Sequence, residues 1–145
     1  MPGSQAAWPV GIGEAAEFPA LAFCEGSPDL LAACHFLWAE GRERDCAPVT
    51  MLGGCASIHP HALPMFAGKR VRIFRHTDAT GEDAADRWAQ QLAEAGADVD
   101  AFRFDGLRCL DGQPVKDLND LAAIYADDFE AHRCLWELFG YALHN

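Results

Sequence analysis

Four acidic residues follow segments of the sequence that favour an extended backbone. These residues are Glu25, Asp78, Asp117 and Asp120. If the segments are parallel strands of one sheet, their carboxyl ends lie along one edge, which is where open α/β sheets place their ligands. Carboxylates gathered there repel one another unless a cation lies between them, and Mg²⁺ prefers such hard oxygen ligands. The pattern therefore predicts a divalent-cation site at which the charge of a phosphate undergoing transfer or cleavage would be neutralised.

The segments that must position these residues alternate between strand-like and helix-like patterns. Apolar, β-branched and aromatic residues predict strands at 20–24, 48–52, 71–74 and 99–104. Helical periodicity and helix-start residues predict helices at 27–40, about 60–66, 81–96, 116–125 and 127–144. Alternation of this kind predicts an α/β fold, with a parallel sheet of about four strands and helices on both faces.

The chain divides into one domain with a segment on either side. Residues 1–19 are rich in glycine and proline and predict a loose lead-in, with Trp8 and Phe18 as its contacts to the body. Residues 20–126 form the predicted domain, and residues 127–145 form a C-terminal helix packed on it. The helix after the first strand is expected to turn five apolar residues inward. They are Leu30, Leu31, Cys34, Leu37 and Trp38.

The net charge and the cysteine content limit the classes of protein to which the chain could belong. The 145 residues carry a net charge of -11, which argues against a broad basic surface for nucleic acid. This acidity indicates either ordinary solubility or a local cluster that holds a divalent cation. The six cysteines include no Cys-x-x-Cys pair, and no stretch has the form of a signal peptide or a membrane span. We therefore expect reduced thiols in a cytoplasmic protein with no membrane partner.

Three short motifs, taken in order, resemble those of the Toprim domain, which bacterial-type primases, topoisomerases, OLD-type nucleases and small RNA-maturation nucleases share. Glu25-Gly26 resembles the Glu-Gly that follows the family's first strand. The segment 76–81, His-x-Asp-x-x-Gly, resembles the Asp-x-Asp-x-x-Gly after its third strand. The Lys-Asp-Leu-Asn-Asp segment at 116–120 resembles a stretch of phage and mobile-element primases. In addition to these three motifs, the segment 50–54 resembles the glycine turn after the family's second strand. The resemblance covers about residues 20–125 and implies a Toprim-like (Rossmann-like) fold.

The resemblance implies a role for each matched residue. Glu25 would be the general acid/base in nucleotidyl transfer or strand cleavage. Asp78 would be a metal ligand, Asp117 and Asp120 would supply further acidic contacts, and Mg²⁺ would be the natural ion, with Mn²⁺ as the alternative. His76 stands where the family has its first Asp, so we also expect it at the metal position. An imidazole ligates transition metals but is a poor ligand for Mg²⁺.

Three basic residues near these motifs could contact phosphates. Lys69 and Arg75 lie on either side of the third predicted strand, and Lys116 opens the last motif. Ordinary solvated charge is the alternative for Lys69 and Arg75. The resemblance implies nucleic acid, either DNA or RNA, as the partner, bound weakly by this acidic chain alone.

The resemblance implies the Toprim domain of a primase-like DNA replication protein from a phage, plasmid or integrated element. Its activity would be Mg-dependent nucleotidyl transfer or strand handling, with a helicase or another replication protein as partner. The imidazole of His76 leaves two alternatives open: a site with altered metal preference, or a fold that has lost catalysis and only binds. A small metal-dependent nuclease is a further alternative.

The acidic motifs also have purely structural interpretations. Glu25, beside a glycine, could be an exposed turn residue, and Asp78 could serve only as the N-cap of the helix that follows. Asp117 and Asp120 suit a helix start, where carboxylates complement the helix dipole.

A second group of metal-ligand types lies between the second and third predicted strands. Cys55, His59 and His61 are close in sequence, but a fourth ligand is missing and prolines interrupt the segment. We therefore expect a loop without zinc at this place.

Overall fold

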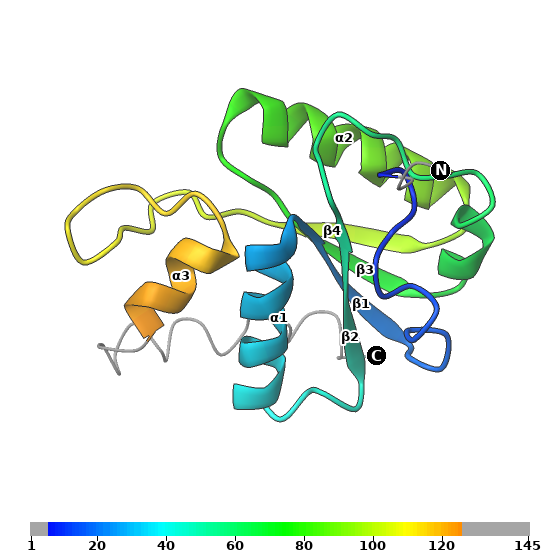
Figure 1. Ribbon diagram of the computed structural model, residues 1–145, viewed down its shortest axis with the longest axis horizontal. Helices are drawn as coiled ribbons and strands as arrows, with labels where there is room; N and C mark the ends of the chain where they lie inside the picture. Colours follow the sequence, from blue (N-terminus) through cyan, green and yellow to red (C-terminus); the bar gives the residue numbers. More distant parts are fainter. Residues whose placement is uncertain (1–5, 126–145) are drawn as a thin grey trace, which may run out of the picture.

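The computed structural model describes residues 6–125, and its centre is a four-stranded, all-parallel sheet. The order of strands across the sheet is β2-β1-β3-β4 (Figure 1). The strands are β1 (Ala20–Glu25), β2 (Cys46–Met51), β3 (Arg70–Phe74) and β4 (Asp98–Phe102). The predicted α/β fold with a parallel sheet of four strands is therefore confirmed.

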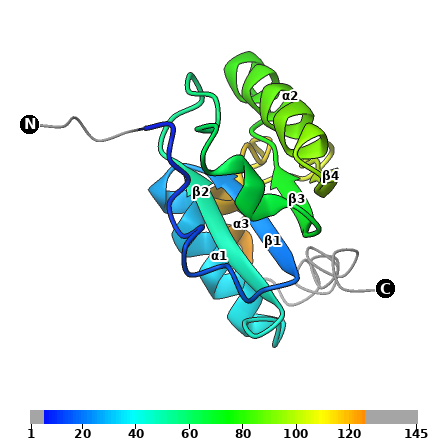
Figure 2. The ribbon, with the colours of Figure 1, turned by 90° about the vertical axis from the view of Figure 1, so that its right-hand side faces the viewer.

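Helices cover both faces of the sheet, as predicted. They are α1 (Ser27–Ala39), the short 3₁₀ helix η1 (Leu63–Phe66), α2 (Ala79–Glu94) and α3 (Leu118–Tyr125). α1 and α3 lie on one face, and α2 and η1 lie on the other (Figure 2). Each face has its own hydrophobic core, because successive side chains of a strand point to opposite sides. Ala22 of β1 thus belongs to the core under α1, and Phe23 belongs to the core under α2.

The inward face of α1 differs from the prediction. Leu31 and Trp38 were expected inside but are 70% and 69% exposed, and Cys34 is exposed as well. The buried residues of the helix are Asp29, Ala32, Ala33, Phe36 and Leu37. Because apolar residues occupy both sides of α1, periodicity alone does not define its buried side. Small alanines, which allow a close approach to the sheet, and the buried hydrogen bonds of Asp29 favour the observed side.

Residues 6–19 form turns that pack on the sheet. Val10 and Thr50 make an antiparallel bridge at the outer edge of β2, with N···O distances of 2.8 and 3.0 Å. Ile12 and Ala15 are buried in the core under α2. The segment has little regular secondary structure, as the glycines and prolines indicate, yet buried apolar residues anchor it.

A small hairpin lies in the connection between β4 and α3. It is closed by an antiparallel bridge between Arg108 and Pro114. Phe104 and Val115, on either side of the hairpin, are buried in the core under α1 and α3. This connection places the start of α3 beside α1, at the carboxyl edge of the sheet.

The predicted C-terminal helix, residues 127–145, lies outside the residues that the structure describes. Within residues 6–125, no helix is long and apolar enough to cross a membrane.

Candidate functional site

The carboxyl edge of the sheet brings together four ionisable side chains from four segments. Glu25 is the last residue of β1, and Asp29 lies in the first turn of α1. His76 follows β3, and Asp117 precedes α3. Because β1 and β3 are neighbouring parallel strands, their ends meet at this edge. Three of the four, Glu25, His76 and Asp117, are site residues predicted from the sequence.

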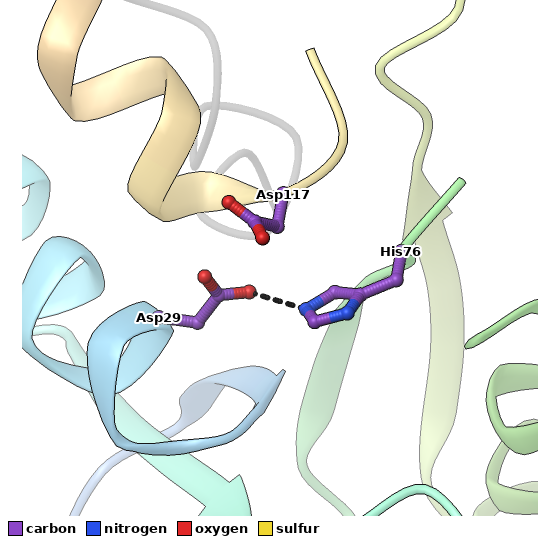
Figure 3. Close-up of side chains that lie close together, drawn as sticks. All are labelled: Asp29, His76 and Asp117. Atoms are coloured by element: carbon purple, nitrogen blue, oxygen red, sulfur yellow. Dashed lines mark hydrogen bonds and ion pairs between the residues drawn. The ribbon is translucent and has the colours of Figure 1, made fainter. Parts of the chain in front are cut away.

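Asp29 links His76 to the start of α3 (Figure 3). The residue is 2% exposed, and its Oδ2 lies 2.8 Å from Nε2 of His76. Its Oδ1 accepts a hydrogen bond from the backbone N–H of Asn119 at 3.1 Å. Both oxygens of this buried carboxylate are therefore engaged, as burial of a charge requires. The contacts fix three segments that are far apart in the sequence.

His76 is protonated at neutral pH. Its hydrogen bond with Asp29 is the main cause that raises its pKa from 6.5 to about 9, against the opposing effect of burial. The negative charges of Glu25 and Asp117 also raise this pKa. Nδ1 of His76 lies 3.6 Å from Oε2 of Glu25. The imidazolium thus supplies a positive charge among carboxylates that would otherwise repel one another.

Asp117 completes a group of three side chains that could hold a metal ion. One carboxylate oxygen of Asp29, one of Asp117 and a ring nitrogen of His76 lie within 4.8 Å of one another. Burial raises the pKa of Asp117, and the nearby charges of Asp29 and Asp120 add to this rise. A backbone hydrogen bond and the charge of His76 lower the same pKa. A cation would stabilise the ionised form of such a carboxylate further.

The donor set of this cluster favours some cations over others. Two carboxylates and an imidazole suit a transition metal such as Mn²⁺ better than Mg²⁺, which prefers oxygen ligands. The imidazole binds a metal only after it loses its proton, so a cation and a proton compete for His76. The residues therefore fit a divalent cation, more readily Mn²⁺ than Mg²⁺ and more readily at higher pH.

Asp78, predicted as a metal ligand, caps α2. Its Oδ1 accepts a hydrogen bond from the backbone N–H of Gly81 at 2.6 Å, and its side chain is exposed. Gly81 is buried against His76, and a Cβ at this position would collide with the Cβ of His76. The glycine of the motif therefore allows α2 to begin next to His76. Asp78 lies outside the three-residue group, and its role as a ligand stays a prediction.

Asp120, another predicted ligand, organises the start of α3. Its Oδ2 accepts a hydrogen bond from the backbone N–H of Lys116 at 3.0 Å, and its own N–H donates to Oδ1 of Asp117 at 2.8 Å. This reciprocal pattern satisfies two backbone N–H groups at a helix start. Lys116 is exposed, and its carbonyl accepts from the backbone N–H of Thr77 at 3.1 Å. The backbone N–H of Asp120 thus orients Asp117, and Lys116 lies beside the site.

The other two predicted phosphate contacts lie at opposite ends of β3. Arg75 follows the strand, and its Nη2 pairs with Oδ1 of Asp86 in α2 at 2.9 Å. Lys69 precedes the strand, and its Nζ donates to three backbone carbonyls within residues 15–18 at 2.6 to 3.2 Å. The structure therefore places Arg75 near the site. It places Lys69 at the amino edge of the sheet, where it holds the N-terminal segment.

The predicted glycine turn after β2 lies against Glu25. A Cβ at Gly54 would be 2.7 Å from Oε1 of Glu25, so glycine leaves the space that the carboxylate occupies. Side chains of α2 form hydrogen bonds with the backbone of the following loop, residues 54–58. They are Arg87, Trp88 and Gln91. The role of α2 in holding this wall of the site was not evident from the sequence.

Asp29 is the site residue that sequence reasoning missed. It is the only charged residue in α1, and it lies on the same helical face as Ala33 and Phe36. A charge on a buried helix face requires a partner. That signal was hidden because α1 is apolar on both sides: Leu37 was correctly assigned to the buried face, but Leu31, Cys34 and Trp38 were not.

The loop that contains Cys55, His59 and His61 forms no metal-capable group within the described part of the chain. The ring of His59 instead packs against Trp8, with ring centroids 5.7 Å apart. Nδ1 of His59 accepts a hydrogen bond from the backbone N–H of His61 at 3.1 Å.

No protein-family model matches the sequence, and neither a curated protein nor a solved structure matches it. A functional assignment therefore rests on the motifs of the chain and on the geometry of the carboxyl edge.

Proposed function

We propose that this chain is a Toprim-like domain of a primase-like replication protein that binds a divalent cation and supports nucleotidyl transfer or strand cleavage. The observation that carries the proposal is the convergence of Asp29, His76 and Asp117, whose donor atoms lie within 4.8 Å of one another. They meet at the edge where open α/β sheets bind ligands. The order of the motifs along the chain supports the same assignment. A bound cation would neutralise the charge of a phosphate under attack.

The residues of the cluster have different roles in this proposal. Asp29 and Asp117 hold the cation, and His76 joins them once it has lost its proton. The side chain of Glu25 is 19% exposed, so its carboxylate is accessible to accept a proton from a substrate oxygen or return one. Lys116 is exposed beside the site, where it would contact the phosphates of a strand, and Arg75, which is paired with Asp86, lies near the same edge.

The expected partner is a single nucleic-acid strand, held weakly by this chain alone. The net charge of -11 opposes broad contact with phosphates. A helicase or another replication protein would then make most of the contacts to the strand, while this chain supplies the cation site.

A second candidate function is a non-catalytic binding module, and the contacts of His76 favour it. The imidazolium lies 2.8 Å from Asp29 and 3.6 Å from Glu25, where it supplies the positive charge that a cation would otherwise supply. A cluster neutralised from within is stable without metal. In this case the Toprim-like fold would serve only to dock a replication partner.

Thermal unfolding with and without cations distinguishes the two candidates, because a ligand that binds only the folded state raises Tm. We expect Mn²⁺ to raise Tm more than Mg²⁺ does, and Asp117→Asn to abolish the shift. Asp83→Asn, an exposed change on α2, is the matched control and should keep it. His76→Asp should move the preference toward Mg²⁺, since it provides a third carboxylate.

Activity is the second measurement. Glu25→Gln should retain the cation-induced rise in Tm and lose strand cleavage or nucleotidyl transfer, because only the proton-transfer group is changed. If millimolar Mn²⁺ and Mg²⁺ leave Tm unchanged in both the wild type and His76→Asp, the cation site is refuted. The binding module would then be the better account.

A further inference from the structure

α1 is apolar on the side that faces away from the sheet as well as on its buried side. Leu31 and Trp38 lie about two turns apart on the outward side and are 70% and 69% exposed. Exposed Cys34 lies between them. A helix that is apolar all round is normally covered on both sides, and a cluster of exposed apolar residues marks an interaction surface.

The outward side of α1 continues into a groove at the edge of the sheet. The groove has a volume of about 310 Å³ and lies between α1, the amino end of β2 and residues 11–18. Its apolar lining consists of Phe18, Cys34, Leu37, Cys46, Ala47 and Pro48. Because Cys34 belongs both to the groove and to the outward side of the helix, the two form one surface. We call this surface, together with Leu31 and Trp38, the α1 groove.

The rim of the α1 groove is acidic. Glu14 and Glu43 line it, and both are exposed. The surrounding segments 11–18 and 41–48 carry four acidic residues against two arginines. An apolar floor with an acidic rim complements a basic segment that carries apolar side chains.

We propose that the α1 groove binds a basic amphipathic helix of a partner protein. Apolar side chains of that helix would fill the groove and cover Leu31 and Trp38, while its lysines or arginines would pair with Glu14 and Glu43. The groove lies at the amino end of β2, whereas the Asp29–His76–Asp117 group lies at the carboxyl edge. The inference is therefore independent of the cation site and adds a second functional surface to the chain.

Titration of the full chain with a labelled peptide tests the proposal. The probe is a synthetic amphipathic helix of leucine and lysine about five turns long, and a leucine–glutamate peptide of equal length is its counterpart. We expect the lysine peptide alone to bind. The double change Glu14→Lys, Glu43→Lys should weaken binding at least about tenfold, because like charges would then face each other.

A matched control makes the same change of charge elsewhere. Asp83→Lys with Glu94→Lys alters two exposed acidic residues of α2, and it should leave the affinity within about twofold of the wild type. Trp38→Ser should weaken binding without lowering Tm, since this side chain lies on the outward side. Equal affinity of the two double variants would overturn the proposal, because it would show attraction by net charge alone.

Two further results would also overturn it by identifying another occupant. Concentration-dependent dimerisation that Trp38→Ser abolishes would show that a second copy of this chain covers the surface. Protection of Cys34 from alkylation in the free, monomeric protein would show that the chain itself covers it. We expect instead that Cys34 is alkylated rapidly in the free protein and slowly with the lysine peptide bound.

Discussion

α1 and α2 lie on opposite faces of the same sheet and differ in how their apolar and charged residues are distributed. α2 is amphipathic in the ordinary way: Asp78 caps it, and Ala84, Trp88 and Leu92 are buried. α1 has no side-chain cap, buries the carboxylate of Asp29 and exposes Leu31.

Two departures of α1 from ordinary patterning coincide with the two surfaces for which we propose a function. Its buried carboxylate organises the carboxyl-edge cluster, and its exposed apolar side forms part of the α1 groove. Local rules that conflict with the fold are expected at functional sites.

The largest expected difference in the free energy of unfolding is between substitutions of the acidic residues at the starts of α1 and α2. Asp29→Ala should lower the free energy of unfolding by about 3–5 kcal/mol, because it leaves His76 and the N–H of Asn119 without their buried acceptor. Asp78→Ala should cost only about 1 kcal/mol, as the loss of an N-cap does. Urea unfolding at neutral pH measures both. Equal costs would show that Asp29 is no more than a helix-start residue.

Substitutions on the two sides of α1 should differ nearly as much in their effect on the free energy of unfolding. Leu37→Ala removes a buried side chain and should cost about 2–5 kcal/mol. Leu31→Ala, a change of the same type on the outward side, should stay within about 0.5 kcal/mol of the wild type. The same unfolding experiment provides the measurement. A large cost at Leu31 would mean that the outward side of α1 is packed in the free protein.

The pH dependence of stability should report His76. Its pKa is raised from 6.5 to about 9 on folding, so its stabilising contribution is complete below pH 6.5 and is lost as the pH rises through 9. The difference corresponds to roughly 3 kcal/mol. His76→Gln should flatten this decline, whereas His61→Gln, an exposed control, should not. An unchanged decline in His76→Gln would assign it to other groups.

The smallest expected change in stability is for Gly54→Ala, in the turn after β2, and the neighbouring Gly53 provides the comparison. A Cβ at Gly54 would displace the flexible carboxylate of Glu25, so Gly54→Ala should cost less than about 1 kcal/mol yet lower the pKa of His76. Gly53→Ala meets nothing within 4 Å and should change neither quantity. Titration of the His76 ring by NMR provides the test. An unaltered pKa in Gly54→Ala would show that Glu25 does not depend on this turn.

Much of the fold could be predicted from the sequence because its strand and helix patterns alternate clearly. That alternation fixes the parallel sheet, and the parallel sheet brings the residues that follow β1 and β3 to one edge. The grouping of Glu25 and His76 was predictable for this reason, and Asp117 was expected at the same edge because it follows the fourth strand.

The remaining details depend on tertiary contacts. The buried side of α1 could not be read from a helix that is apolar all round, and Asp29 was missed as a consequence. The role of Lys69 was also not evident. Its position before the strand places it at the amino edge, but its hydrogen bonds to the carbonyls of residues 15–18 depend on how the N-terminal segment packs.

The most direct test of the cation site is a calorimetric titration of the full chain with Mn²⁺ at neutral pH. Two buffers with different ionisation enthalpies report the number of protons released. Because the imidazolium of His76 must lose its proton to become a ligand, we predict saturable binding with the release of about one proton per ion. Absence of binding, or binding without proton release, would contradict the account that His76 exchanges a proton for a metal ion.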